Sequence, residues 1–242
     1  RDLRTHQARS RVIYYKHNSY YWEAKEAEFV KVAEEFYAER KSSGADVAYV
    51  ADYLFYGIGR RDRAIEILLT AHAEKLLNEA QQAKLVEMLH YCGRHGESIA
   101  ILQPLIELRL DNIRYRVQLM TAYFHTKQPN QLRATLEQAD RHFHEGNLWR
   151  EGVIAELATG CLNTQLYEPS VEYFKELVPL HQRTHTRRGI GDGTLSSYYA
   201  NMARAYAGLK KTAEAVDAAC GAVVAWGPDH SNRANALDAL RQ

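Results

Sequence analysis

The sequence has little of what would set it apart from an ordinary helical globular chain. Only 5 of its 242 residues are proline and 14 are glycine, which disfavours collagen-like, linker-like and turn-dense β structures. Neither sign of charge dominates, because 31 basic side chains balance 30 acidic ones for a formal net charge of +1. Such a chain has no general attraction for nucleic acid or anionic membranes. No uncharged run approaches the roughly 18 residues of a membrane helix, so no membrane span is expected.

Cysteine is also scarce. Three cysteines cannot all pair with one another, and this usage is typical of a reducing compartment, so a cytoplasmic location is expected. Cys161 and Cys220 fall at predicted packing positions, where free cysteine behaves as a small hydrophobe rather than a nucleophile. The sequence begins at Arg1 rather than Met, and no charged-then-apolar signal segment follows it. We therefore expect it to be either a trimmed chain or a piece of a longer one.

Apolar residues follow a helical period over long stretches, and the alternation typical of strands is absent. A longer repeat runs through this pattern, in which an apolar helix and a short polar turn precede a second helix. The inward positions of the second helix are spaced i, i+4 and i+7: Ala64, Leu68 and Ala71; Ser98, Leu102 and Leu105; Leu132, Leu136 and Ala139; Ser170, Phe174 and Leu177; Ala215, Ala219 and Ala222. Successive units are 34, 34, 38 and 45 residues apart. Residues at this spacing share one helical stripe, so each hairpin is predicted to stack on the next and cover its apolar face.

The repeat resembles the tetratricopeptide repeat (TPR) family. The matching residues are Phe55, Gly59, Ala64 and Ala71 in the first unit, Tyr123 and Ala139 in the third, and Ala203, Tyr206, Ala215 and Ala222 in the fifth. The sequence departs from the family where a tryptophan near the start of the first helix is replaced by Ala48, Gln82, Arg116, Ile154 and Tyr199. The resemblance covers about residues 45 to 229 and implies an all-α fold. This fold is an α-α superhelix, or solenoid, of about five TPR-like helical hairpins with flanking N- and C-terminal helices.

The segments outside the regular spacing define the expected organisation of the chain. We expect N-terminal helices over 1–44 that pack on the first repeat, repeats 1 to 4 over 45–184, and repeat 5 over 196–229. A glycine-rich loop is expected over 185–195, because three alternate glycines cannot continue a helix cheaply. A C-terminal helix is expected over 230–242, after the helix stop at Trp226, Gly227 and Pro228.

The family resemblance implies that the first helix of each hairpin lines a concave groove that binds a partner. The residues that we expect to contact the partner are Tyr49, Tyr53, Tyr56, Glu87, His90, Thr121, Phe124 and Arg204. Tyrosines offer a large contact area with little rotamer entropy to lose. The sequence thus predicts a non-enzymatic scaffold for a protein or peptide partner. The alternative interpretation of the tyrosines is packing against the N-terminal helix.

Two other functions remain open at this point. Residues 1–22 mix basic side chains with tyrosines and a tryptophan, a combination on which single-stranded RNA stacks. The second alternative is a regulatory domain of a larger enzyme, although no catalytic constellation is evident. No cofactor is expected. His181 and His185 are spaced to share a helix face, and His90, Cys92 and His95 lie close in sequence, but a third ligand is not evident and no metal site is predicted. Oligomeric state does not follow from the sequence.

Overall fold

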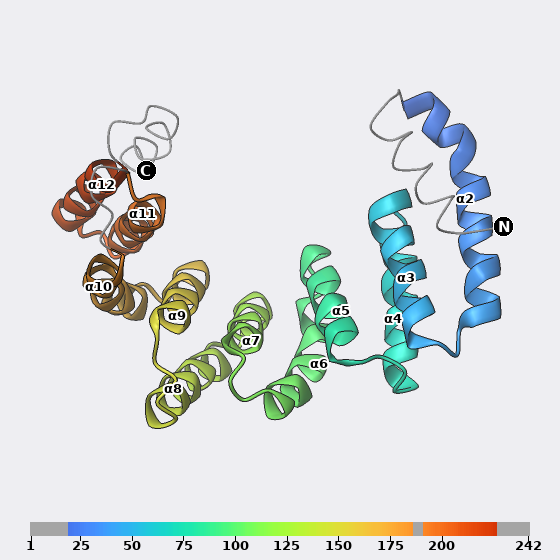
Figure 1. Cartoon of the computed structure of the whole chain (residues 1–242), viewed down its shortest axis with the longest axis horizontal. Coiled ribbons are helices and arrows are strands. Elements are labelled where there is room, and N and C mark those ends of the chain that lie inside the picture. The colour runs from blue at the N-terminus through green and yellow to red at the C-terminus, as the bar shows by residue number, and fades with distance from the viewer. Residues whose placement is uncertain (1–18, 186–190, 227–242) are drawn as a thin grey trace. The chain divides into compact units, whose positions relative to one another are not determined.

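The computed structural model describes residues 19–185 and 191–226, with side chains from residue 26 onward. Every regular element in these ranges is a helix (Figure 1). The elements are α2 (Ser19–Arg40), α3 (Gly44–Asp52), η1 (Tyr53–Ile58), α4 (Arg61–Ala73), α5 (Glu79–Tyr91), α6 (His95–Leu108), α7 (Ile113–His125), α8 (Pro129–Glu145), α9 (Glu151–Asn163), α10 (Tyr167–Thr184), α11 (Gly193–Gly208) and α12 (Thr212–Trp226). The chain divides into two compact units, 1–101 and 102–242. They are called unit 1 and unit 2 below.

The helices pair as the repeat spacing predicts. The first helices of the five hairpins, called A helices, are α3 with η1, α5, α7, α9 and α11, and the second or B helices are α4, α6, α8, α10 and α12. All the predicted inward positions of the B helices are buried except Ala215, which is half-buried. The prediction of an all-α helical-hairpin repeat is confirmed.

Side-chain caps fix several helix starts. Ser43, Asn78, Asn112 and Asp192 each accept a hydrogen bond from a backbone N–H in the first turn of the helix that follows. Asn78 forms a capping box, because the side chain of Gln81 also accepts from the Asn78 N–H. These short polar residues satisfy N–H groups that have no partner within the helix.

One backbone conformation ends the A helix in every hairpin. The turn residue has positive φ at Gly59 (84°), Gly93 (72°), Lys127 (57°), Gln165 (58°) and Lys210 (59°). Glycine adopts this left-handed conformation at little cost, whereas a residue with a Cβ pays for it. The fold therefore imposes the same turn even where the sequence supplies lysine or glutamine.

Unit 1 is organised around the first hairpin. Helix α2 contacts both α3 and η1, and its Glu34 carboxylate accepts two hydrogen bonds from the Arg63 guanidinium of α4, at 2.8 and 2.9 Å. The A helix of this hairpin ends in a π-turn, η1, so the closing bond runs from the Arg60 N–H to the Leu54 carbonyl. In the second hairpin the equivalent bond spans one residue fewer, from Arg94 to Leu89.

Unit 2 repeats the same packing with small residues at the close contacts. The A helices α7, α9 and α11 contact one another in sequence order, and α10 contacts both α9 and α11. The Ser170 hydroxyl donates to the Ala158 carbonyl at 2.9 Å, which shows how closely the start of a B helix approaches its A helix. Cys161 is buried as predicted, and burial raises the pKa of its thiol to about 12. Cys220 is exposed, so its predicted packing role is wrong; its neighbours Ala218 and Ala219 are the buried residues of that turn.

Some expected segments lie outside the described residues. These are the basic N-terminal segment 1–18, part of the glycine-rich loop (186–190), and the C-terminal helix with its helix stop (227–242). Helix α11 begins at Gly193, earlier than the expected start at residue 196, because Asp192 caps it. Among the helices that the structure describes, none combines the length and apolar character needed to cross a membrane.

Candidate functional site

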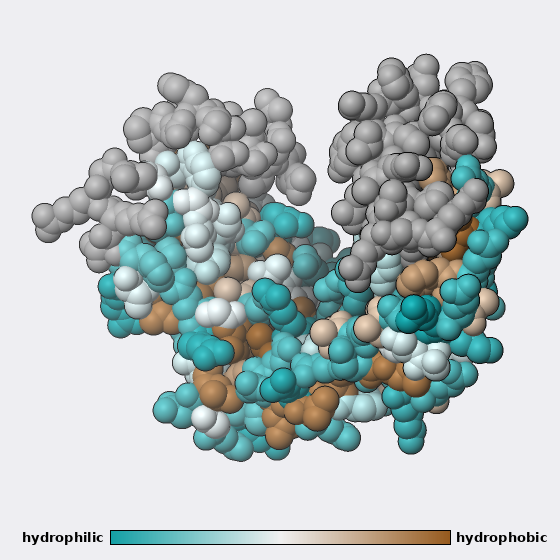
Figure 2. Space-filling view, turned by 45° about the vertical axis from the view of Figure 1, so that its right-hand side comes forward, coloured by the Kyte–Doolittle hydropathy of each residue, from teal (hydrophilic) through white to brown (hydrophobic). Residues whose placement is uncertain are grey.

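Large apolar side chains are mostly inside the molecule. Hydrophilic residues cover much of the visible described surface, with apolar residues in separate patches between them (Figure 2). The exposed large hydrophobic residues in the described ranges are Tyr56, Tyr91, Leu108, Leu110, Val216 and Val224. Two of them are tyrosines of unit 1, and these two line one cavity.

That cavity has a volume of about 230 Å³ and lies where the A helices of the first two hairpins end. Its side-chain walls are Phe55, Tyr56, Arg61 and Tyr91, which we call the aromatic patch, and 57–59 complete it. Tyr56 is 55% exposed and Tyr91 is 64% exposed, while Phe55 is buried between them. The Phe55 ring meets both tyrosine rings edge-on, with centroids 4.7 Å from Tyr56 and 5.6 Å from Tyr91.

Two cations contact the tyrosine rings of the aromatic patch. The Arg61 guanidinium lies 4.7 Å from the Tyr91 ring centroid and donates to the Tyr91 hydroxyl at 3.2 Å. The Lys84 ammonium lies 5.0 Å from the Tyr56 ring centroid. Partial burial raises the pKa of the Tyr56 hydroxyl despite the opposing charge of Lys84, so Tyr56 remains a neutral phenol at physiological pH.

The structure separates the three predicted tyrosines by burial. Tyr49 is half-buried, Tyr53 is completely buried and Tyr56 is exposed. Tyr53 follows Tyr49 in ordinary α-helical register, since its N–H donates to the Tyr49 carbonyl, and its side chain lies with Leu54 and Phe55 in the core. A partner cannot reach the Tyr53 side chain, so this member of the predicted groove needs correction.

The other predicted groove residues are divided between the two units. In unit 1, Glu87 is exposed, and half-buried His90 lies 2.8 Å from the Ser98 hydroxyl through its Nε2 atom. In unit 2, Thr121 and Phe124 are half-buried and Arg204 is exposed. The Thr121 hydroxyl donates to the Val117 carbonyl. These side chains belong to A helices as expected, but their role in binding remains a prediction.

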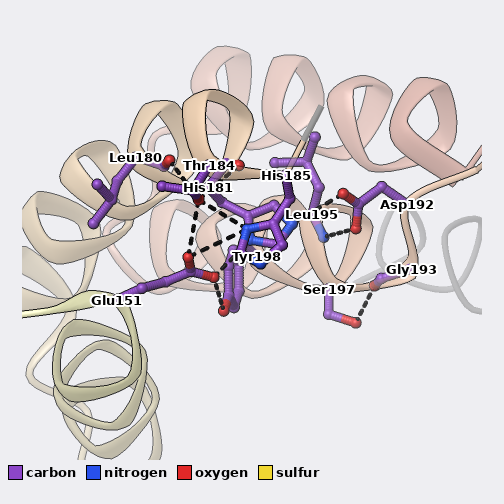
Figure 3. A network of polar contacts seen from close by, with 10 residues as sticks. All are labelled: Glu151, Leu180, His181, Thr184, His185, Asp192, Gly193, Leu195, Ser197 and Tyr198. Carbon is purple, nitrogen blue, oxygen red and sulfur yellow. Dashed lines mark hydrogen bonds and ion pairs between the residues drawn. The ribbon is translucent and has the colours of Figure 1, made fainter. Parts of the chain in front are cut away.

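A second cavity, in unit 2, is polar. It has a volume of about 580 Å³ and is lined by Glu151, His181, His185, Gly191, Asp192, Gly193, Thr194, Ser197 and Trp226. The first residue of α9, the end of α10 and the residue that caps α11 supply its charged groups. Glu151, His181, His185 and Asp192 form what we call the histidine–carboxylate cluster (Figure 3).

The His181 ring is held from both sides. Its Nδ1 atom lies 2.6 Å from Glu151 Oε1, and its Nε2 atom lies 2.9 Å from Asp192 Oδ2. The His185 ring stacks on it with a centroid separation of 4.3 Å and places its Nδ1 3.5 Å from Glu151 Oε2. The hydroxyls of Thr184 and Tyr198 also donate to Glu151, each at 3.3 Å.

Contacts within this cluster stabilise the charged forms of both His181 and Glu151. Burial lowers the pKa of the His181 imidazole, but hydrogen bonds with Glu151 and Asp192 outweigh burial, and the net pKa is raised. Burial likewise opposes ionisation of Glu151, yet its contacts with His181 and His185 bring its pKa below the ordinary value. The cluster therefore favours ionised carboxylates around a shared imidazole.

Sequence reasoning missed Tyr91, Glu151 and Asp192 as members of these sites. Glu151 precedes His181 by 30 residues, and no short ligand motif connects them. The repeat itself carried a signal, because in a helical hairpin the start of the first helix lies beside the end of the second. The basic and aromatic segment 1–22, which favoured RNA, lies outside the described side chains and stays untested.

Comparison with known proteins identifies the fold. No protein-family model matches the chain, and no curated protein matches it. A solved Podosopora anserina protein with nearly identical TPR-like repeats has a TM-score of 0.57 at 18% identity, covering 76% of this chain and 95% of that one. BtubC (BKLC) from P. vanneervenii has a TM-score of 0.52 at 13% identity, covering 89% and 95% of the two chains. MamA has a TM-score of 0.52 at 14% identity, covering 77% and 92%.

These similarities define the class of protein that the chain resembles. It is an all-α repeat protein with the TPR-like solenoid fold. The resemblance that the sequence showed through its 34-residue spacing is thereby confirmed at the level of the fold.

Proposed function

We propose that this protein is a non-enzymatic scaffold that binds a peptide segment of a partner protein, with the aromatic patch of unit 1 as the anchor. The observation that carries the proposal is the pair Tyr56 and Tyr91, 55% and 64% exposed, on the wall of one cavity. Exposed tyrosines that share a concave surface are typical of binding hot spots. The TPR-like fold supports the proposal, because it presents successive A helices side by side.

The cavity favours a particular chemistry in the partner. A volume of about 230 Å³ suits a single large side chain, and the rings of Phe55, Tyr56 and Tyr91 supply apolar contact for it. The Arg61 guanidinium, which donates to Tyr91, has further N–H groups in its planar fork for a carboxylate. We therefore propose a peptide that inserts an aromatic or long aliphatic side chain and carries an acidic residue beside it.

The predicted groove residues of unit 1 extend this surface in the proposal. Glu87 and His90 lie on α5, the same helix that ends at Tyr91. Thr121, Phe124 and Arg204 lie on the A helices of unit 2, and we propose them as partner contacts of that unit considered by itself. The anchor at Tyr56 and Tyr91 contributes most of the affinity, since few residues dominate most interfaces.

The test begins with selection of peptides from a phage-displayed library on the full chain, followed by fluorescence anisotropy with one synthetic selected peptide. Tyr56→Ala and Tyr91→Ala are expected to weaken its binding by about tenfold or more each. Val224→Ala removes an 80% exposed side chain of α12 and serves as the matched control; it should leave binding unchanged. Equal binding by the folded tyrosine variants and the control would reject the aromatic patch as the anchor.

A further inference from the structure

The histidine–carboxylate cluster brings together donor atoms that no short sequence motif predicts. One nitrogen of His181, one of His185 and one carboxylate oxygen of Glu151 all lie within 4.8 Å of one another. No other group of three or more such side chains at this spacing occurs among the described residues. His90 and His95, whose rings lie 4.8 Å apart, do not form a group of this kind with Cys92.

The donor set has the chemistry of a transition-metal site. Two imidazoles and one carboxylate are a known ligand set for zinc, with the fourth position left to water or a bound molecule. The hard cations Mg²⁺ and Ca²⁺ prefer sites made mainly of oxygen atoms. The cluster therefore suits a borderline divalent cation, and the adjoining cavity of about 580 Å³ leaves room for a further ligand.

Asp192 supplies the feature that distinguishes this cluster from an ordinary ion pair. It lies 2.9 Å from His181 Nε2, the ring nitrogen that faces away from Glu151. A carboxylate there accepts the Nε2–H and leaves the Nδ1 lone pair directed toward the other ligands. Asp192 is itself fixed, because its Oδ1 atom accepts from the Leu195 N–H and its own N–H donates to the Ala225 carbonyl.

Of the two histidines, only His185 has room to reorient around a bound ion. His181 is buried, with 4% of its surface exposed, whereas His185 lies just past the end of α10 and is exposed. The two rings are stacked nearly parallel, at 16°, so His185 must turn about its side-chain bonds to point its lone pair at a shared ion. Its exposed position allows that rotation without a change in the core.

We propose that Glu151, His181 and His185 bind one zinc ion or a similar divalent transition-metal ion, with Asp192 orienting His181. The ion takes the place of the hydrogen bond between Glu151 and His181 Nδ1. It thereby joins the start of α9 to the end of α10, and Asp192 connects that end to the start of α11 through His181. This site is independent of the aromatic patch and of the function proposed for it.

The experiment is calorimetric titration of the full chain with zinc chloride, repeated with cobalt(II) to record its visible d–d absorption. Wild type is expected to take up the ion with a cobalt spectrum typical of mixed nitrogen and oxygen ligands. His185→Ala removes an exposed ligand and is expected to weaken binding by about tenfold or more. Glu151→Gln, which retains the side-chain volume, is expected to weaken it similarly.

His144→Ala is the matched control. His144 is also an exposed histidine near a helix end beside a carboxylate, 3.7 Å from Asp140, but it belongs to no group of three ligands. It should leave the titration unchanged, and circular dichroism should show that all variants are folded. Absence of zinc uptake by wild type would overturn the proposal, as would equal affinities for wild type, His185→Ala and Glu151→Gln.

Discussion

The aromatic patch and the histidine–carboxylate cluster are built at different kinds of helix junction. The patch lies where A helices end and turn into B helices, at Tyr56, Gly59 and Tyr91. The cluster lies where a B helix ends and the next A helix starts, at His181 and Asp192. The first junction has the same left-handed turn in every hairpin, whereas the second varies in length as the spacing grows from 34 to 45 residues.

This difference shows two ways in which a repeat acquires a specific surface. At the constant junction, the last residues of the A helices provide the surface, because Tyr56 and Tyr91 are both exposed there. At the variable junction, added residues bring in polar groups that the repeat does not contain, and Asp192 is one of them. The two kinds of junction can therefore be perturbed separately.

Destabilisation of unit 1 should leave unit 2, and with it the histidine–carboxylate cluster, largely unaffected. A Cβ atom added at Gly44 would overlap the backbone carbonyl of Leu76, which cannot move as a side chain can. Gly44→Ala is therefore expected to lower the free energy of unfolding of unit 1 by about 2–3 kcal/mol. Hydrogen exchange measured by mass spectrometry should accelerate within 44–91 and much less within 151–208. Uniform acceleration in both ranges would contradict the separation.

Asp192→Asn should weaken zinc binding at the histidine–carboxylate cluster and leave the aromatic patch unchanged. The asparagine retains an oxygen to cap α11 but loses the charge that faces His181. Zinc affinity is expected to fall by about 10- to 100-fold, the usual cost of removing a carboxylate that orients a metal-binding histidine. Calorimetric titration measures this, and binding of the selected peptide at the aromatic patch should not change. Unaltered zinc affinity would show that Asp192 does not orient His181.

The left-handed turns offer a gain in stability. Lys127 and Lys210 have φ of 57° and 59° at the positions that Gly59 and Gly93 occupy in the first two hairpins. Lys127→Gly and Lys210→Gly are each expected to raise the free energy of unfolding by about 0.5–1 kcal/mol, since glycine adopts this conformation without the Cβ penalty. Urea denaturation measures the change. Lys127→Ala is the control, because it removes the side chain but keeps the Cβ, and it should give no comparable gain.

The ion pair between Glu34 and Arg63 should make the stability of unit 1 depend on pH. The hydrogen bond from Arg63 holds the pKa of Glu34 below its ordinary value. Its stabilisation is therefore complete above the unfolded-state pKa and is lost as pH falls through the lower folded-state value. Glu34→Gln is expected to cost about 0.5–1 kcal/mol at pH 7, because the pair is partly exposed.

Urea denaturation at several pH values checks this last prediction. The difference between Glu34→Gln and wild type should shrink as the medium becomes more acidic than the ordinary glutamate pKa. Glu172→Gln is the control, because it removes one member of the exposed ion pair between Lys175 and Glu172. It should lower the free energy of unfolding by less than Glu34→Gln does. A pH-independent cost for Glu34→Gln would assign its effect to packing instead.

The sequence predicted the repeat well because burial of the B helices is periodic. Ser98 and Ser170 could be placed inside with the alanines at equivalent positions, and both are buried. The turns at Lys127 and Gln165 were not predictable from residue type, since neither favours positive φ. There, the stacking of neighbouring hairpins decides the backbone conformation.

The sites were less predictable because they depend on helix ends rather than helix faces. Helical spacing placed Tyr53 and Tyr56 on one exposed stripe, but Tyr53 is fully buried and only Tyr56 is exposed. The spacing also put His181 and His185 on one face, which the stacked rings bear out. Glu151 joins them only through tertiary packing of α9 against α10, which local patterns do not encode.

The double attachment of Asp192 has a consequence for how this chain tolerates insertions and deletions. One of its carboxylate oxygens starts α11 and the other holds the imidazole of α10. A single residue inserted between Asp192 and Leu195 would force the carboxylate to bind either the helix N-terminus or the imidazole, so this short stretch should not tolerate a change in length.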